Sequence, residues 1–242
     1  MEIIDDSTIV NEITKRIKRK FHLFDNKRVD IHISDLIYCI TKKYWKDTQP
    51  ATQILDDDAL MFSIGLGLER VLLEDDANNP NRPPVIAVDG VFFNGDYELT
   101  INEDELGELK TTRAYYNKDN VPTHGYPNGW VKQIAGYAYA YKKTNYHLAV
   151  FQVISAKLIG KQFKFTQDEL DLYWKDYILP RRKAYLEARL YNKPPQPFRY
   201  NDGEWECNRC AFQLNCAMSI VNKDYLPEII NKLPDTFIIN KS

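Results

Sequence analysis

Three cysteines crowd a short stretch near the C-terminal end of the chain, and they restrict its fold more than any other feature of the sequence. Cys207, Cys210 and Cys216 are spaced as C-x2-C-x5-C, and a two-residue gap lets two thiolates bind one metal centre. The remaining cysteine, Cys39, lies far upstream and completes a set of four. Four thiolates suit either zinc or an iron–sulfur cluster, and spacing alone does not separate the two. The pattern predicts a chain whose two ends meet at a metal.

A second pattern, Glu108-Leu109-Lys110, lies in an expected β-strand. Side chains alternate along a strand, so Glu108 and Lys110 share one face while Leu109 points the other way, into a core. Just upstream, Asp96 and Glu98 alternate with apolar residues, which predicts the partner strand of a hairpin. Two carboxylates and an ammonium that meet there can hold a divalent cation and activate a water against a phosphodiester. An isolated E-x-K is also typical of a solvated edge strand.

Helical and strand patterns alternate around this hairpin. We expect helices at 7–21, 34–39 (capped by Ser34), from after the acids 56–58 to about 74, 130–143 and 166–191 (kinked at Pro180). We expect strands at 85–88 and 91–93 around an Asp89-Gly90 turn or bulge, and at 146–155 and 162–165. Gly65 and Gly67 predict that another backbone approaches the third helix closely. These elements predict an α/β fold.

Composition limits the function classes. Hydrophobic residues make up 44% and charged residues 27%, as is ordinary for a globular protein. The net charge of −2 gives no global attraction to nucleic acid, so a polyanion site must be local, and 15–20 and 181–183 are the basic runs available. No export signal and no apolar run of membrane-spanning length is present, so we expect a cytoplasmic protein with free or metal-bound thiols and no membrane contact.

With these motifs in order, the chain resembles the PD-(D/E)xK nucleases of RecB type, and specifically their CRISPR-associated exonuclease branch with an iron–sulfur cluster. The resemblance covers residues 33–216. In that family a cysteine after an S-D-L-x-x-C opening and three C-terminal cysteines hold a 4Fe–4S cluster, matching Cys39, Cys207, Cys210 and Cys216. It implies a restriction-endonuclease-like central mixed sheet flanked by helices, in a single nuclease domain (1–242) with its core at about 56–165. A cluster subdomain from about 30–50 plus 195–220 would join the terminal segments.

The catalytic motifs of the family also have counterparts here. They are Glu69 after Gly65, where a histidine is more usual, Asp96 with Glu98 as its competitor, the pair Glu108 and Lys110, and the Q-x-x-x-Y residues Gln133 and Tyr137. The resemblance implies that Glu69, Asp96, Glu108 and the carbonyl of Leu109 bind magnesium or manganese. Lys110 would position or deprotonate the water or stabilise charge on the phosphate, and Gln133 and Tyr137 would orient Lys110 or the DNA backbone.

The implied activity is metal-dependent cleavage of DNA by an exonuclease that acts on single strands, in CRISPR spacer acquisition, recombination or viral replication. Its partners would be DNA, CRISPR integrase subunits and further copies of the chain. Two alternatives stay open: a non-catalytic iron–sulfur or zinc module that binds DNA or an integrase partner, and a zinc-stabilised interaction protein without nucleic-acid chemistry.

Overall fold

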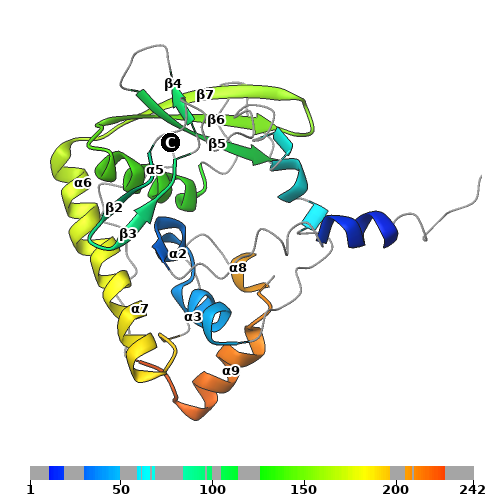
Figure 1. Cartoon of the computed structure of the whole chain (residues 1–242), viewed down its shortest axis with the longest axis vertical. Helices are drawn as coiled ribbons and strands as arrows, with labels where there is room; N and C mark the ends of the chain where they lie inside the picture. The colour runs from blue at the N-terminus through cyan, green and yellow to red at the C-terminus, as the bar shows by residue number, and fades with distance from the viewer. Residues whose placement is uncertain are drawn as a thin grey trace, which may run out of the picture.

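The computed structural model describes residues 11–18, 30–49, 59–60, 62–65, 67–68, 84–95, 97–99, 105–113, 126–196, 205–208 and 210–226. They form an α/β fold (Figure 1) with the elements β1 (Ile31–His32), α2 (Ile33–Ile37), α3 (Ile40–Thr48), β2 (Ile86–Val88), β3 (Val91–Phe93), β4 (Tyr97–Leu99), β5 (Glu105–Thr112), α5 (Asn128–Ala140), β6 (Asn145–Gln152), β7 (Lys157–Lys164), α6 (Gln167–Tyr173), η1 (Trp174–Ile178), α7 (Leu179–Tyr191), α8 (Trp205–Asn208) and α9 (Gln213–Asn222). Residues 11–18, 59–60, 62–65 and 67–68 are also helical.

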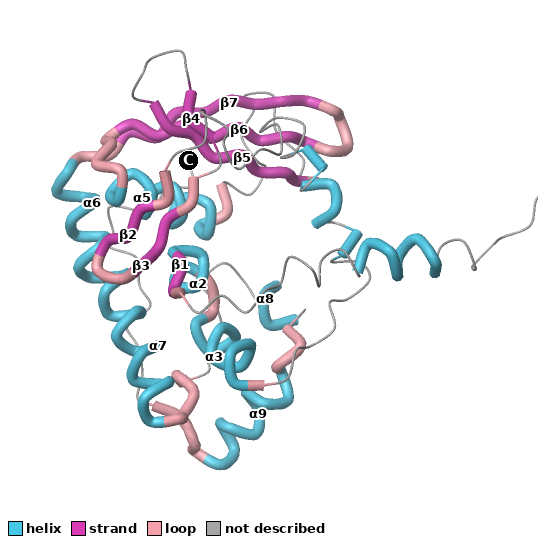
Figure 2. Tube along the Cα trace, in the orientation of Figure 1, coloured by secondary structure: helices cyan, strands magenta, loops and turns pink. Residues whose placement is uncertain are grey.

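The larger sheet is mixed and has the strand order β4-β5-β6-β7 (Figure 2). β4 and β5 are antiparallel, so the predicted hairpin upstream of the E-x-K motif is confirmed. β5 and β6 are parallel, and the chain passes from one to the other through α5, as parallel neighbours require a crossover. β7 returns antiparallel to β6. The E-x-K strand is therefore an inner strand of the sheet and is paired on both sides.

A smaller sheet has the order β1-β3-β2. β2 and β3 form a hairpin whose two turn residues, Asp89 and Gly90, have φ angles of 49° and 70°. Two consecutive positive φ angles are the signature of the tight turn that suits antiparallel strands, and they favour an Asp-Gly pair. A side chain on Gly90 would also come within 2.8 Å of the Arg182 guanidinium. The turn predicted at this position is confirmed.

Helix α5 lies between the larger sheet and the elements β2, β3 and α2 (Figure 1). Its residues Ile134, Ala135 and Ala138 have no exposed surface. A Cβ on Gly136 would lie 2.8 Å from the Ile33 side chain of α2, so the glycine permits the close packing of the two helices. One hydrophobic cluster contains residues of α2, α5, α6, η1, α7 and both sheets, and this core supports one face of β5.

The long helix predicted over 166–191 is divided by a π-helical turn. Its start is as predicted: Thr166 Oγ1 accepts a hydrogen bond from Glu169 N (3.2 Å), and Thr166 N donates to Glu169 Oε2 (2.7 Å). A kink was expected at Pro180, and the helix is irregular in the turn before this residue, the π-helical turn η1. Proline has no N–H to continue the α-helical ladder, and a widened turn before it accommodates the missing bond.

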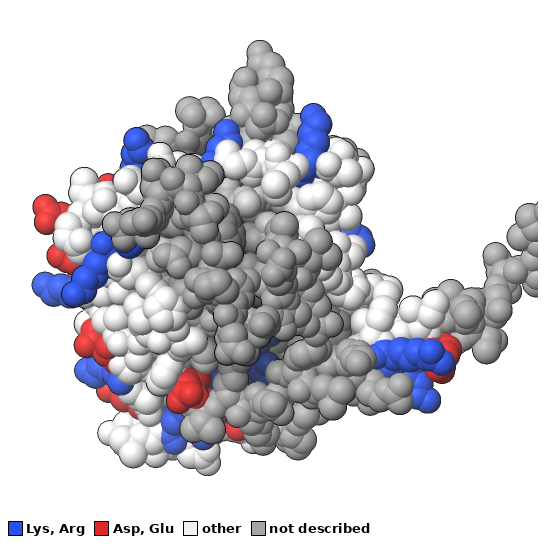
Figure 3. Space-filling model, turned by 45° about the horizontal axis from the view of Figure 1, so that its top comes forward, with Lys and Arg blue, Asp and Glu red and all other residues white. Residues whose placement is uncertain are grey.

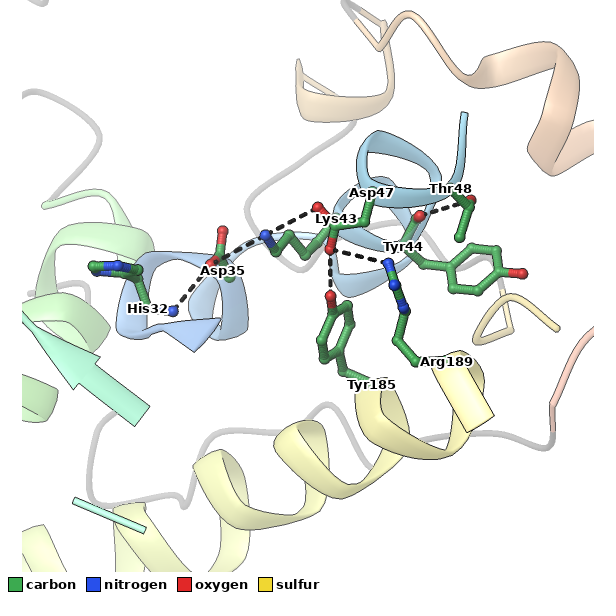
Figure 4. Close-up of polar contacts among 8 residues, drawn as sticks. All are labelled: His32, Asp35, Lys43, Tyr44, Asp47, Thr48, Tyr185 and Arg189. Carbon is green, nitrogen blue, oxygen red and sulfur yellow. Dashed lines mark hydrogen bonds and ion pairs between the residues drawn. The ribbon is translucent and has the colours of Figure 1, made fainter. Parts of the chain in front are cut away.

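Polar contacts fasten α3 to α7 (Figure 4). Asp47 on α3 accepts a hydrogen bond from the Tyr185 hydroxyl, and its carboxylate lies 3.9 Å from Arg189 on α7. Lys43, one turn before Asp47, lies 3.1 Å from it and 3.6 Å from Asp35 on α2. The three helices around Cys39 therefore share one charge network.

Three local predictions were wrong. Helix α2 begins at Ile33 with His32 as its N-cap, so Ser34 is not the cap; the His32 N–H donates to Asp35 Oδ2 at 3.0 Å. Leu109 is only half-buried, because α5 covers the opposite face of β5. Among the described residues, a Cβ on Gly67 would meet nothing within 4 Å and one on Gly65 would meet the Thr111 hydroxyl at 3.4 Å, so no described backbone approaches either glycine.

On the face shown in Figure 3, charged side chains of both signs are spread over the described part of the surface. On residues 11–18, Arg16 pairs with Glu12 at 2.8 Å and both are exposed. The basic run at 181–183 is not one surface patch, because Arg181 has no exposed surface. No helix among the described residues combines the length and hydropathy needed to cross a membrane.

Candidate functional site

Glu108, Lys110 and Gln133 form a triangle of polar side chains beneath the larger sheet. Gln133 Nε2 donates to Glu108 Oε1 at 2.7 Å, and Lys110 Nζ donates to Gln133 Oε1 at 2.9 Å. Lys110 Nζ also contacts Glu108 Oε1 directly. Because the amide nitrogen faces the carboxylate and the amide oxygen faces the ammonium, the orientation of Gln133 is fixed by both charges.

Local structure explains why these residues meet. Glu108 and Lys110 are two positions apart on β5 and project to the face that α5 covers. Gln133 and Tyr137 are one helical turn apart on α5, so both face the strand. Gln133 Nε2 lies 3.4 Å from the Tyr137 hydroxyl, which donates to the carbonyl oxygen of Asn94 at 2.9 Å. A hydrogen-bonded chain thus runs from the carboxylate to the backbone just after β3.

The triangle is largely withdrawn from water. Glu108 is 1% exposed and the Lys110 side chain 18%. A buried charge is costly unless it is paired and hydrogen-bonded, and each of these two ions is held by the other and by Gln133. A carboxylate fixed in this way can serve as a hard oxygen ligand for a divalent cation, and the ammonium beside it can stabilise a developing negative charge.

Strand β4 passes directly beside this triangle. Its first residue, Tyr97, pairs with Gly107, the neighbour of Glu108, and Glu98 pairs with Leu106. Asp96 and Glu69, the other two predicted carboxylate ligands, lie outside the described residues, and only the backbone of Glu98 is described. The structure therefore brings together four predicted site residues, Glu108, Lys110, Gln133 and Tyr137.

Two participants were missed in the sequence. Asn94 contributes only its carbonyl oxygen, and a backbone contact of that kind leaves no side-chain signal. Glu206, which directly precedes Cys207, is 4% exposed and contacts the backbone of Cys39. An acid directly before a cysteine motif is the signal that could have indicated it.

The four cysteines are carried by segments from the two ends of the chain. Cys39 is the N-cap of α3, and its Sγ accepts a hydrogen bond from Lys42 N at 3.4 Å. Cys207 lies in α8, Cys210 follows it and donates its N–H to Cys207 O at 3.0 Å, and Cys216 lies in α9. None of the four cysteines forms a disulfide. α8 and α9 lie beside α3 in Figures 1 and 2, which places both sets of cysteines in one region.

The thiols affect one another electrostatically. Burial raises the pKa of Cys39 to about 12; the Lys42 N–H opposes this shift, while Glu206, Cys216 and Cys207 add to it. Burial likewise raises the pKa of Cys216 to about 11, with Trp45 acting in the opposite direction and Cys210 and Cys207 adding to the increase. Thiols that shift one another's pKa lie within reach of each other's charge. At neutral pH these two are protonated in the absence of a metal.

The donor set fits a thiolate-bound metal, but the thiols do not yet surround one point. No three His, Cys, Asp or Glu side chains among the described residues are placed to hold a metal ion as they stand. Four cysteine sulfurs are the ligand set of structural zinc sites and of 4Fe–4S clusters. Binding either would require Cys39, Cys207, Cys210 and Cys216 to lose their protons and to move closer together.

Comparison with known proteins gives the fold and no more. No family model matches the chain, and no curated protein matches it. Among solved structures, one titled "Crystal structure of SSO0001" aligns with 87% of this chain and 97% of its own length, at 18% identity and a TM-score of 0.51. The two chains share an α/β architecture over most of their lengths, and at that identity the likeness does not extend to function.

Proposed function

We propose that this chain is a divalent-metal-dependent deoxyribonuclease with a PD-(D/E)xK site of the RecB type and a restriction-endonuclease-like fold. The observation that carries the proposal is the buried triangle of Glu108, Lys110 and Gln133, completed by Tyr137. Its members are the residues of the E-x-K and Q-x-x-x-Y motifs, in that order along the chain. Two weak sequence motifs that meet in one hydrogen-bonded site support a common role.

Glu108, Asp96, Glu69 and the carbonyl of Leu109 would hold magnesium or manganese, with Glu98 as the alternative to Asp96. The cation would lower the pKa of a bound water and neutralise charge on the phosphate. Lys110 would orient that water or stabilise charge that develops on the phosphate oxygens. Gln133 keeps Lys110 and Glu108 in a fixed relation, and Tyr137 holds Gln133 against the backbone of Asn94.

The substrate in this proposal is DNA, most of all a single strand cut from an end. The biological settings that fit are CRISPR spacer acquisition, recombination and viral replication in the cytoplasm, with integrase subunits and further copies of the chain as candidate partners. Because the net charge is −2, DNA must be bound by local basic groups. Lys15 and Arg16 on the helical residues 11–18 are exposed groups of this kind.

The cysteine region supports a second candidate function, a metal-stabilised module that binds DNA or a protein partner without cleaving it. Four gathered thiols favour it, because a thiolate-bound metal stabilises a fold whether or not a separate active site is present. We propose a 4Fe–4S cluster as the occupant, with zinc as the alternative.

Hydrolysis of end-labelled single-stranded DNA with Mn²⁺ separates the two functions. The wild-type protein is expected to cleave, and Glu108→Ala to lose cleavage, because it removes a carboxylate from the cation site. Glu187→Ala, which removes a partly exposed acid on α7, is the matched control and is expected to remain active. Wild-type protein that binds DNA but does not cleave it with Mn²⁺ or Mg²⁺ would favour the binding module.

A further inference from the structure

The peptide group that joins Tyr38 to Cys39 is held by buried charges at both of its ends. Its carbonyl oxygen accepts a hydrogen bond from the Arg181 guanidinium of α7. Its N–H faces both carboxylate oxygens of Glu206 on α8, and each lies 3.3 Å from Cys39 N. Arg181 is fully buried and Glu206 is 4% exposed. A cation at the oxygen and an anion at the nitrogen match the peptide dipole, so together they fix the plane of this peptide.

Both charges have further partners, as burial of a charge requires. Arg181 also donates to the carbonyl of Leu36, and its guanidinium lies 5.0 Å from the centre of the Tyr177 ring. Glu206 Oε1 lies 3.9 Å from Lys42 Nζ. Arg181 therefore anchors the peptide to the core of the domain, and Glu206 anchors it to the C-terminal cysteine segment.

The orientation of this peptide decides where the Cys39 thiol points. The peptide plane and the extended backbone of Cys39 (φ −65°, ψ 106°) set its Cα–Cβ direction, and the Lys42 N–H holds the sulfur at 3.4 Å. Glu206 is the residue before Cys207, so its contact aligns the two cysteine-bearing segments with each other. The contact between Glu206 and Cys39 involves only groups of the chain and needs no metal.

We propose that Glu206 is a positioning residue that joins the two ends of the chain and directs the Cys39 thiol toward the C-terminal thiols before any metal binds. A metal then meets two cysteine-bearing segments that are already aligned with each other. The first half of this inference is independent of the proposed function; the second half rests on the proposal that the four thiols bind a metal.

Hydrogen exchange of the Cys39 amide in the reduced, metal-free protein tests the first half. Glu206→Ala is expected to speed exchange about tenfold or more, since a hydrogen bond to a charged group is lost. Glu206→Asp keeps the charge but shortens the side chain. It should lose most of the exchange protection of the Cys39 amide while a carboxylate stays at position 206. Glu206→Gln retains a hydrogen-bond acceptor and should keep part of the exchange protection of the Cys39 amide. Unchanged exchange in both Glu206→Ala and Glu206→Asp would overturn the proposal.

Titration with Co²⁺, followed by its thiolate absorption bands, tests the second half. Glu206→Ala is expected to weaken binding about 10–100-fold, as loss of a residue that orients a ligand does. Thr41→Val is the control for stability, because it breaks a different contact between the chain ends, the 3.2 Å hydrogen bond from Thr41 Oγ1 to Pro195 O. A Thr41→Val variant that matched Glu206→Ala in both exchange and affinity would contradict a positioning role. Faster exchange in Glu206→Ala, together with wild-type protein that binds no Co²⁺, would support the positioning and contradict the proposed metal centre.

Discussion

The E-x-K site and the cysteine region are built in opposite ways. The hydrogen bond between Gln133 and Glu108 links residues 25 positions apart, on a strand and the helix that follows it. The contact between Glu206 and Cys39 spans 167 positions and joins short helices from opposite ends of the chain. The first site is positioned by regular elements that share a core; the second depends on a few buried charges. The two regions should therefore respond separately to substitution.

The largest effect is expected from Lys110→Ala. Turnover should fall about 10²–10⁴-fold while DNA affinity changes little, because the ammonium acts mainly on charge that develops during the reaction. Single-turnover cleavage and equilibrium binding of the same labelled strand would measure the two quantities. The metal content of the cysteine region should stay unchanged. Equal losses of affinity and turnover would make Lys110 an ordinary phosphate anchor.

Cys39→Ser should produce the converse result. Anaerobically purified wild-type protein is expected to be brown, with broad absorption near ~400 nm from thiolate-bound iron and sulfide. The variant should lose this colour and melt several degrees lower, since ligand binding contributes to folding free energy. Assayed well below its melting temperature, it should keep nuclease activity within a few-fold. A colourless wild-type protein with stoichiometric zinc would replace the cluster with zinc, and a fully coloured variant would exclude Cys39 as a ligand.

A smaller effect is expected from Gln133→Leu. The amide separates and orients two opposite charges, and its loss should lower turnover about 10–100-fold, in line with other residues that position catalytic groups. Tyr137→Phe is the companion change; it removes the hydroxyl that links Gln133 to Asn94 and should cost about 1 kcal/mol of stability. Chemical denaturation and steady-state kinetics on both variants would distinguish a positioning role from a purely structural one.

The smallest effect is the contribution of Cys39 to the pH dependence of stability. Burial raises the pKa of Cys39 to about 12, above the ordinary value of 9.0 for a thiol. As pH rises above about 9, the unfolded chain releases this proton and the folded chain keeps it, so stability present below pH 9 decreases toward pH 12. Metal-free wild-type protein should therefore melt a few degrees lower at pH 10 than at pH 8. Cys39→Ser should show a shallower decrease, and an identical one would contradict this account.

The E-x-K site was more predictable than the cysteine region because its causes are local. The period of two along β5 placed Glu108 and Lys110 on one face, and the helical period placed Gln133 beside Tyr137. Which face of β5 is buried was predicted wrongly: Leu109 was assigned to a core that lies on the Glu108 side. Only the packing of α5 decides that point, and no pattern within the strand reveals it.

For the cysteine region, the sequence predicted that the four cysteines come together, but it did not predict the contacts that align them. The total of four cysteines and the family resemblance indicated that Cys39 belongs with the C-terminal three. The role of Arg181 was hidden, because a basic residue beside Arg182 and Lys183 suggests solvent or phosphate rather than two backbone carbonyls in the core. Glu206 was hidden as well, because its partner Cys39 lies 167 positions earlier in the chain. Contacts over such distances depend on tertiary structure that no sequence window contains.

The contact between Cys39 and Glu206 also has a consequence for how the protein is made. At a synthesis rate of about 5–20 residues per second, a separation of 167 positions leaves Cys39 waiting roughly 10–30 s for its partner to emerge. During that interval the β5–α5–β6 unit is already complete and can fold, since its contacts are short in sequence. Cys39 meanwhile remains a solitary thiol on the nascent chain, open to oxidation or to stray metal ions. The contact between Cys39 and Glu206 thus forms late in biogenesis, and the period before it is when this cysteine is most vulnerable.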